Sequence, residues 1–223
     1  MTAPLLIIVP TRGRRANLER LLQTFALSRA GETDLLVVAD DDDPSYDGLK
    51  LPGRCRLVSR PRACLTDKLN QHAVPLTAEY QMIGFLGDDC VLESHGWDNA
   101  FRDELKTPGI AWPNGERQDY GEHEVVSSVI IRALGWYFPP EMSHYWTDVA
   151  LADIGRGAGC YRKAEGAIIR HRHKEHGTDD TYRLAESTAE ADQQAYWRWH
   201  ETRRNADIAT VKAAIGLDRC LSF

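Results

Sequence analysis

Met82-Ile-Gly-Phe-Leu-Gly-Asp-Asp-Cys-Val-Leu92 begins as an apolar run and reaches two adjacent carboxylates, Asp88 and Asp89. The run is typical of a buried strand, and open α/β sheets bind ligands at the carboxyl ends of their strands. Two adjacent acids at such a position need a counter-charge, which Mg²⁺ or Mn²⁺ holding a diphosphate would supply. The alternative is that the acids cap the turn or helix that follows.

The composition of the chain is that of a single globular domain without a membrane span. The chain has 223 residues, 43% of them hydrophobic, which suits one substantial core. Its net charge of −6 disfavours nonspecific nucleic-acid binding. Five cysteines without Cys-x-x-Cys spacing argue against a disulfide framework and a structural zinc site, and predict a cytoplasmic location. No apolar window approaches 18 residues, so no membrane span is expected.

Strands and helices alternate over the first ninety residues. The predicted strands are 5–9, 35–39, 56–59 and 81–86, and the predicted helices are one with Asn17 as N-cap and one over 64–74 that ends before Pro75. This alternation predicts an α/β fold with a parallel, doubly wound sheet and with loops gathered at the strand ends.

The pattern loosens after residue 96. The elements predicted there are a helix over 97–105, a strand over 109–112, a strand and then a helix over 125–134, a helix over 148–157, a strand over 167–170, and a mostly helical tail from 181 to about 214. We therefore divide the chain into a domain over 1–180, with halves at 1–95 and 96–180, and a helical C-terminal extension over 181–223.

Glycine-rich phosphate loops are missing from the sequence. No Gly-x-Gly-x-x-Gly follows the first strand, and there is no P-loop. An α/β sheet with acids at its strand ends must then hold phosphate through a bridging cation or through basic side chains.

Several motifs occur in a characteristic order. They are Pro10-Thr-Arg-Gly-Arg14 with Asn17-Leu18, Val37-Val-Ala-Asp-Asp41, Lys68-Leu-Asn70, Phe85-Leu-Gly-Asp-Asp89, His144-Tyr-Trp-Thr-Asp-Val-Ala-Leu-Ala-Asp153, Gly159 and Ile168-Ile-Arg-His-Arg-His173. Together they resemble a GT-A fold glycosyltransferase of the family 2-like kind over roughly residues 4 to 180. The resemblance implies a GT-A (Rossmann-like), mostly parallel central sheet flanked by helices. It also implies metal-dependent transfer of a sugar from a nucleotide-diphosphate donor, with a UDP-sugar favoured, to a hydroxyl acceptor.

The resemblance also assigns the nucleoside pocket. It implies that Pro10, Thr11 and Arg12 line this pocket and that Asp40 or Asp41 accepts a hydrogen bond from the base. A uracil ring offers an N–H donor that suits a carboxylate. The alternative is a solvated acidic turn, to which we assign the two acids that follow.

Two residues of the predicted 64–74 helix resemble residues of the family that face the nucleotide. They are Lys68 and Asn70, and Lys68 would neutralise phosphate as a point charge. An exposed helical lysine is the alternative.

The metal site is implied by a shortened Asp-x-Asp motif. Asp89 is the expected direct ligand, and Asp88 is expected to contact ribose or metal-bound water. The first acid position of the motif is not acidic here, so the number of ligands stays open. His171 or His173 is expected to be a further ligand, since imidazole suits Mn²⁺.

Asp148 matches the acid that acts as general base in inverting members of the family. Deprotonating the acceptor hydroxyl as the new bond forms needs a carboxylate within hydrogen-bond reach. The alternative is an N-cap for the helix starting near Val149. His144, Trp112 and Asn114 are acceptor-side candidates.

Two other functions are alternatives to glycosyl transfer. The chain can be a sugar-nucleotide nucleotidyltransferase, or a GT-A-like module that has lost catalysis and binds a glycan or partner. The acceptor is not specified by the sequence: a small molecule, a glycan, a protein and a modified DNA base all fit.

Overall fold

One sheet of eight strands organises the computed structural model over the residues it describes, 3–115, 120–172, 183 and 185–216. The strand order is β3-β2-β1-β4-β7-β6-β8-β5. The pairs among β1 (Leu5–Thr11), β2 (Thr33–Asp40), β3 (Cys55–Arg60) and β4 (Met82–Phe85) are parallel. The parallel sheet predicted for the first ninety residues is confirmed.

The second half of the sheet is mixed. Strand β7 (Val125–Ser127) is antiparallel to both β4 and β6 (Ile110–Asn114), whereas β6 is parallel to β8 (Tyr161–His171). Strand β5 (Cys90–Leu92) was not predicted, and β8 begins well before the predicted residue 167. The start of β8 is rich in charged residues, so its strand conformation depends on pairing with β6 rather than on local pattern.

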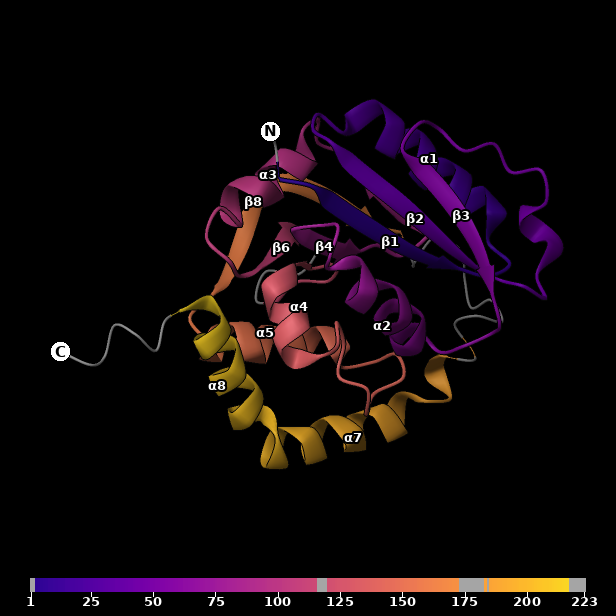
Figure 1. The fold of residues 1–223 in the computed structure, drawn as a ribbon. Coiled ribbons are helices and arrows are strands. Elements are labelled where there is room, and N and C mark those ends of the chain that lie inside the picture. Colours follow the sequence, from indigo (N-terminus) through magenta and orange to yellow (C-terminus); the bar gives the residue numbers. More distant parts are fainter. Residues whose placement is uncertain (1–2, 116–119, 173–182, 184, 217–223) are drawn as a thin grey trace.

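Helices cover both faces of the sheet (Figure 1). They are α1 (Arg15–Ser28), α2 (Leu65–Leu76), α3 (Trp97–Glu104), α4 (Ser128–Leu134), α5 (Thr147–Gly157), α7 (Ala189–Thr202) and α8 (Arg204–Ile215), with a short 3₁₀ helix η1 (Pro44–Tyr46). Helices α1 and α3 pack on one face, and α2, α4, α5, α7 and α8 pack on the other. None of the described helices is long and apolar enough to cross a lipid bilayer.

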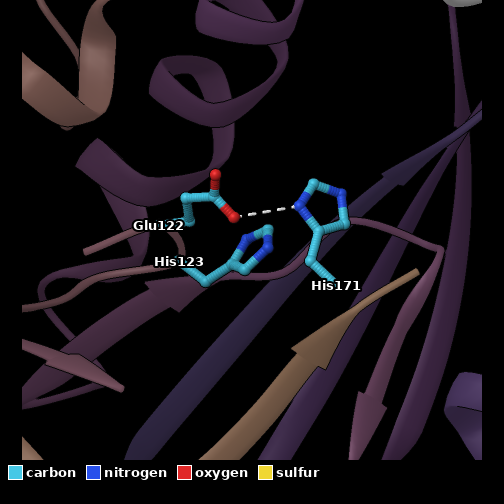
Figure 2. A group of neighbouring side chains, drawn as sticks. All are labelled: Glu122, His123 and His171. Carbon is cyan, nitrogen blue, oxygen red and sulfur yellow. Dashed lines mark hydrogen bonds and ion pairs between the residues drawn. The ribbon is translucent and has the colours of Figure 1, made fainter. Parts of the chain in front are cut away.

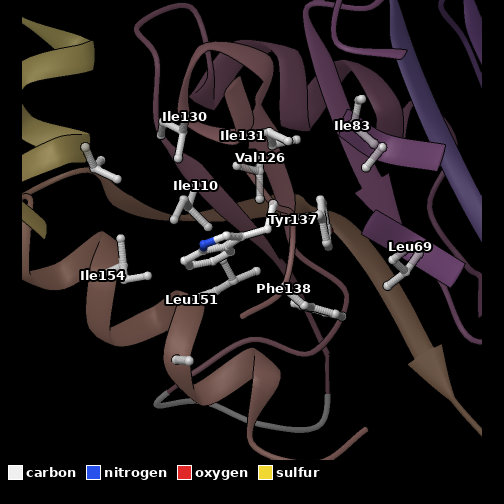
Figure 3. Packing of buried hydrophobic residues seen from close by; sticks show 14 of the residues in the cluster. Leu69, Ile83, Ile110, Val126, Ile130, Ile131, Tyr137, Phe138, Leu151 and Ile154 are labelled. Atoms are coloured by element: carbon white, nitrogen blue, oxygen red, sulfur yellow. The ribbon is translucent and has the colours of Figure 1, made fainter. Parts of the chain in front are cut away.

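Both faces of the central strands are buried, which explains their continuous apolar runs. In β1, Leu6 and Ile8 belong to the cluster that contains residues of α2 and α5, while their neighbours Leu5 and Ile7 belong to the cluster that contains residues of α1. Figure 3 shows the first of these two clusters, where sheet residues meet side chains of α4 and α5. Trp199 of α7 belongs to the same cluster, so the C-terminal helices share this core.

Two predicted helix ends were wrong. Helix α1 begins at Arg15, because the Arg14 carbonyl accepts hydrogen bonds from the amides of Asn17 and Leu18 at 3.0 and 3.1 Å; Asn17 therefore lies inside the helix and is not its N-cap. Helix α2 runs through Pro75 to Leu76. Pro75 has no backbone N–H, so the last turn of α2 lacks one hydrogen bond to the carbonyl four residues earlier.

A buried carboxylate, Asp98 of α3, joins this helix to the start of β2. It accepts hydrogen bonds from the amides of Ala30 and Gly31, the Thr33 hydroxyl and the Arg102 guanidinium, at 2.6 to 2.9 Å. Burial alone would raise the pKa of Asp98, but these bonds outweigh burial and hold it below its usual value. Asp98 is therefore charged in the folded protein.

We expect Asp98→Asn to lower the free energy of unfolding by about 3 kcal/mol, because Arg102 would keep a buried charge without its carboxylate. Because the folded pKa of Asp98 is depressed, its contribution is present above the unfolded pKa of about 3.9 and is lost as pH falls further. Urea unfolding at pH 7 and at pH 3 measures both effects. Asp103→Asn, which changes an exposed acid of the same helix, is the matched control. Equal urea midpoints for wild type and Asp98→Asn at pH 7 would contradict this account.

Candidate functional site

A cavity of about 240 Å³ lies at the carboxyl ends of β1, β2 and β4. Open parallel sheets bind ligands at this edge. Most residues predicted for the site line the cavity: Pro10, Thr11, Arg12, Asp40, Lys68, Asp88, Asp89 and His171. Segments far apart in the sequence therefore meet at one place, as the order of the motifs predicts.

Three predicted residues lie outside the lining of this cavity: Asp41, Asn70 and Asp148. His173 lies outside the described residues. The Asn70 amide is bonded within the fold, since its oxygen accepts from the amides of Tyr137 and Phe138 and its nitrogen donates to the Phe138 carbonyl. Asn70 thus fixes the chain near residue 138 and does not line this cavity, where a nucleotide-facing residue was predicted. The Asp41 side chain is exposed.

The acid pair is buried at the end of β4. Asp88 and Asp89 are 4% and 3% exposed. The Thr11 hydroxyl donates to Asp88 at 2.6 Å. Gly87 leaves room for the turn, because a Cβ there would lie 2.7 Å from a carboxylate oxygen of Asp89. The apolar strand and its glycine therefore present both acids to the cavity.

The counter-charge comes from the turn after β1. Arg14 Nη1 lies 3.4 Å from Asp88 Oδ1 and 3.7 Å from Asp89 Oδ2. Burial raises the pKa of Asp88 to about 7, and the neighbouring Asp89 carboxylate adds to this, against the Thr11 and Arg14 contacts. The Arg14 guanidinium is thus one positive group close to both acids, at a place that would also attract a divalent cation.

His171, the last residue of β8, lies between two carboxylates. Its Nε2 is 3.0 Å from Asp89 Oδ1, and its Nδ1 is 3.1 Å from Glu122 Oε2. Burial would lower the pKa of His171, but hydrogen bonds to Asp89 and Glu122 raise it to about 9. Figure 2 shows the histidine facing Glu122, with His123 beside it.

These groups can hold a divalent cation. Two adjacent ligands of an octahedral ion with bonds of about 2.1 Å are about 3.0 Å apart, which matches the separation of Asp89 Oδ1 and His171 Nε2. A second possible set is Glu122, His123 and His171, whose ligand atoms lie within 4.8 Å of one another. Carboxylate oxygen with imidazole nitrogen suits Mn²⁺.

Asp40 sits between two cations. Arg12 Nη1 donates to Asp40 Oδ2 at 2.9 Å, and Lys68 Nζ forms an ion pair with the other oxygen. Lys68 is 7% exposed and lines the cavity, which excludes the exposed-lysine alternative. Of the last two acids of the run, Asp42 pairs with Arg12, whereas Asp43 accepts from the Ser45 amide at the start of η1. The acidic run is thus divided between the cavity and a turn.

The opposite wall of the cavity is held by the C-terminal helix α7. The buried Asp192 carboxylate accepts hydrogen bonds from the consecutive amides of Ser143, His144 and Tyr145 at 2.7 to 2.9 Å. Ser143 and His144 line the cavity. Burial lowers the pKa of His144, which is therefore a neutral imidazole near pH 7.

Asp148 follows this wall in the first turn of α5. The helix begins at Thr147 with Trp146 in the N-cap position, so Asp148 is not the N-cap. Its carboxylate accepts from the amide of Val149 at 2.9 Å. The side chain is half-buried and lies close enough to Glu124 that its negative charge raises the pKa of that buried acid, after the larger effect of burial.

Comparison with known proteins gives the fold. No family model and no curated protein sequence matches the chain. A mannosyltransferase from Pyrobaculum calidifontis, in complex with GDP-Man and Mn²⁺, matches 100% of this chain and 77% of its own length, with a TM-score of 0.64 at 13% identity. The chain has the GT-A fold.

Other GT-A structures match at similar levels. Glucosyl-3-phosphoglycerate synthase from Mycobacterium tuberculosis, with Mn²⁺ and UDP, gives a TM-score of 0.60 at 13% identity over 96% of this chain and 80% of that chain. Residues 1–349 of TarS from S. aureus, with UDP, give 0.53 at 16% identity, over 75% of this chain and 57% of that chain. At these identities the likeness concerns the fold.

Three residues of this candidate site were not among those predicted from the sequence: Arg14, Glu122 and His123. Arg14 belongs to the Pro10–Arg14 motif but was given no role of its own, although a basic residue in the turn after the first strand is a sequence signal for an anion or acid partner. Glu122 and His123 come from a polar loop without periodicity. The available signal was the pair of adjacent residues, an acid and a histidine, which are both possible metal ligands.

Proposed function

We propose that this chain is a metal-dependent glycosyltransferase that uses a nucleotide-diphosphate sugar, with a UDP-sugar as the favoured donor. One observation carries the proposal: the buried Asp88–Asp89 pair meets His171 at a cation-compatible separation in the cavity of a GT-A fold. The mannosyltransferase and the synthase named above were solved with Mn²⁺ and with GDP-Man or UDP, which agrees with this donor class.

Each wall of the cavity would bind a different part of the donor. Asp89 and His171 would hold Mn²⁺ or Mg²⁺, which neutralises the departing diphosphate when bound. Arg12, Pro10 and Thr11 would line the nucleoside site, where Asp40 would accept a hydrogen bond from the base. Lys68, which is paired with Asp40, would orient that carboxylate. Asp88, bonded to Thr11, would face the ribose or metal-bound water.

The acceptor would approach along the wall formed by Ser143 and His144. Asp148, in the first turn of the next helix, would remove the proton of the acceptor hydroxyl, and a single displacement would invert the anomeric carbon. The acceptor can be a small molecule, a glycan, a protein or a modified DNA base.

Nucleotide release tests this function. The purified chain is incubated with UDP- and GDP-sugars, with and without Mn²⁺, and UDP or GDP is measured together with its binding by calorimetry. Metal-dependent release supports a transferase. Binding without release with any acceptor would favour a module that has lost catalysis, and release of pyrophosphate from a nucleoside triphosphate and a sugar phosphate would favour a nucleotidyltransferase.

Arg14 is expected to affect metal and nucleotide in opposite directions. Its guanidinium occupies the acid pair, so Arg14→Gln removes a positive charge that competes with Mn²⁺ and that would attract a diphosphate. Compared with wild type, we expect Arg14→Gln to bind Mn²⁺ about tenfold more tightly when no nucleotide is present. In the presence of Mg²⁺, we expect the same variant to bind UDP about tenfold more weakly than wild type. Calorimetry measures both. Lys106→Gln, an exposed lysine, controls for net charge. A fall in both affinities would contradict competition at this site.

A further inference from the structure

The two ring nitrogens of His171 face two different carboxylates. Nε2 lies on the cavity side, beside the buried Asp89, and Nδ1 lies beside Glu122. The side chain of Glu122 is 22% exposed, whereas that of Asp89 is 3% exposed. The imidazole therefore bridges a buried acid at the cavity and an acid near the surface; Figure 2 shows its contact with the second of these, Glu122.

We propose that Glu122 is a positioning residue that holds His171 for a cation shared with Asp89. By accepting a hydrogen bond from Nδ1–H, Glu122 fixes the tautomer in which the Nε2 lone pair is available to the metal. It also fixes the ring plane in the direction of Asp89. This inference rests on the proposed function, because the cation is the one that would serve the donor diphosphate.

The alternative is that Glu122 is itself a ligand, together with His123 and His171. The contacts of His123 restrict its part in this set to Nδ1. Its Nε2 lies 3.1 Å from the sulfur of buried Cys90, and its ring packs against Phe85 at 5.2 Å. A cation on the Glu122 side of His171 would also lie on the opposite side of the ring from Asp89.

Mn²⁺ binding to the full chain without nucleotide separates the two arrangements. With calorimetry as the readout, Asp89→Asn should abolish binding. Glu122→Ala should weaken it 10- to 100-fold, which is the usual effect of removing the hydrogen-bond partner of a ligand histidine. Glu122→Gln keeps an oxygen that can accept from Nδ1–H, so it should recover most of that loss. His123→Phe keeps the ring but removes both nitrogens, and should stay within about threefold of wild type.

The controls distinguish the possible failures. Glu165→Gln removes an exposed acid of β8, and thermal unfolding of each variant verifies folding. Wild-type affinity in Glu122→Ala would overturn the inference and leave the proposed function standing. Equal losses in Glu122→Gln, Glu122→Ala and His123→Phe would overturn it in favour of the direct-ligand set. Absence of Mn²⁺ binding by the wild-type chain would overturn both the inference and the proposed function.

Discussion

Asp89→Asn is expected to reduce Mn²⁺-supported turnover of the nucleotide sugar at least about a thousandfold. A bound cation contributes several kcal/mol by neutralising the leaving diphosphate, and about 4 kcal/mol corresponds to a thousandfold in rate. The amide that replaces Asp89 is neutral and is a poorer ligand. The measurement is the release of UDP or GDP at saturating donor, as a function of Mn²⁺ concentration.

The control for this variant is Asp47→Asn, which removes an exposed acid outside the cavity and should leave turnover unchanged. Because Asp89 also contacts His171, the folded fraction of Asp89→Asn must be verified by its thermal transition. Turnover within tenfold of wild type, in a folded variant, would mean that Asp89 does not hold the cation.

Asp148→Asn is expected to lower the rate of the chemical step by about 10² to 10⁴ while the affinity for UDP stays unchanged. The physical reason is that an amide cannot accept the proton of the acceptor, whereas the donor contacts are made by other residues. With the acceptor unidentified, slow hydrolysis of the nucleotide sugar by water provides the readout, since water also needs a base. Calorimetry with UDP and Mn²⁺ provides the affinity.

His144→Gln is the matched variant for this test. His144 lines the cavity and is a neutral imidazole, so it is a second group, four residues before Asp148, that can accept a proton. A large loss in His144→Gln with a small one in Asp148→Asn would transfer the role of base to His144. A weaker UDP affinity in Asp148→Asn would instead indicate that the acid supports the donor site.

The N-terminal half of the fold was predictable because its signals are local. Strands buried on both faces have continuous apolar runs, as in β1 and β2, and their ends are marked by polar residues and proline. The site residues at those ends, such as Thr11, Asp40 and Asp89, could be placed because parallel strands bring their carboxyl ends to one edge.

The parts of the fold and of the candidate site that were not predicted depend on contacts between distant segments, which a local sequence pattern does not reveal. The amide of Asn70 is bonded to the chain near residue 138, and Arg14 reaches acids more than seventy residues later. Strand β5 has three residues and exists by pairing with β8. Glu122 lies in the loop before β7, which contacts His171 of β8 and Phe85 of β4. Such roles are decided by packing between segments that are distant in sequence.

The three amides bonded by Asp192 have a consequence for protein engineering. The side of the cavity that carries Asp88 and Asp89 is built on the sheet, whereas the 143–145 wall is attached to a carboxylate 47 to 49 residues later in the chain. If the 143–145 loop were replaced by a loop from another protein, the new backbone amides would lie in different positions. The Asp192 carboxylate of the retained α7 would then no longer accept their hydrogen bonds. Chimeras intended to change this wall of the cavity therefore need to exchange the loop and α7 as a pair.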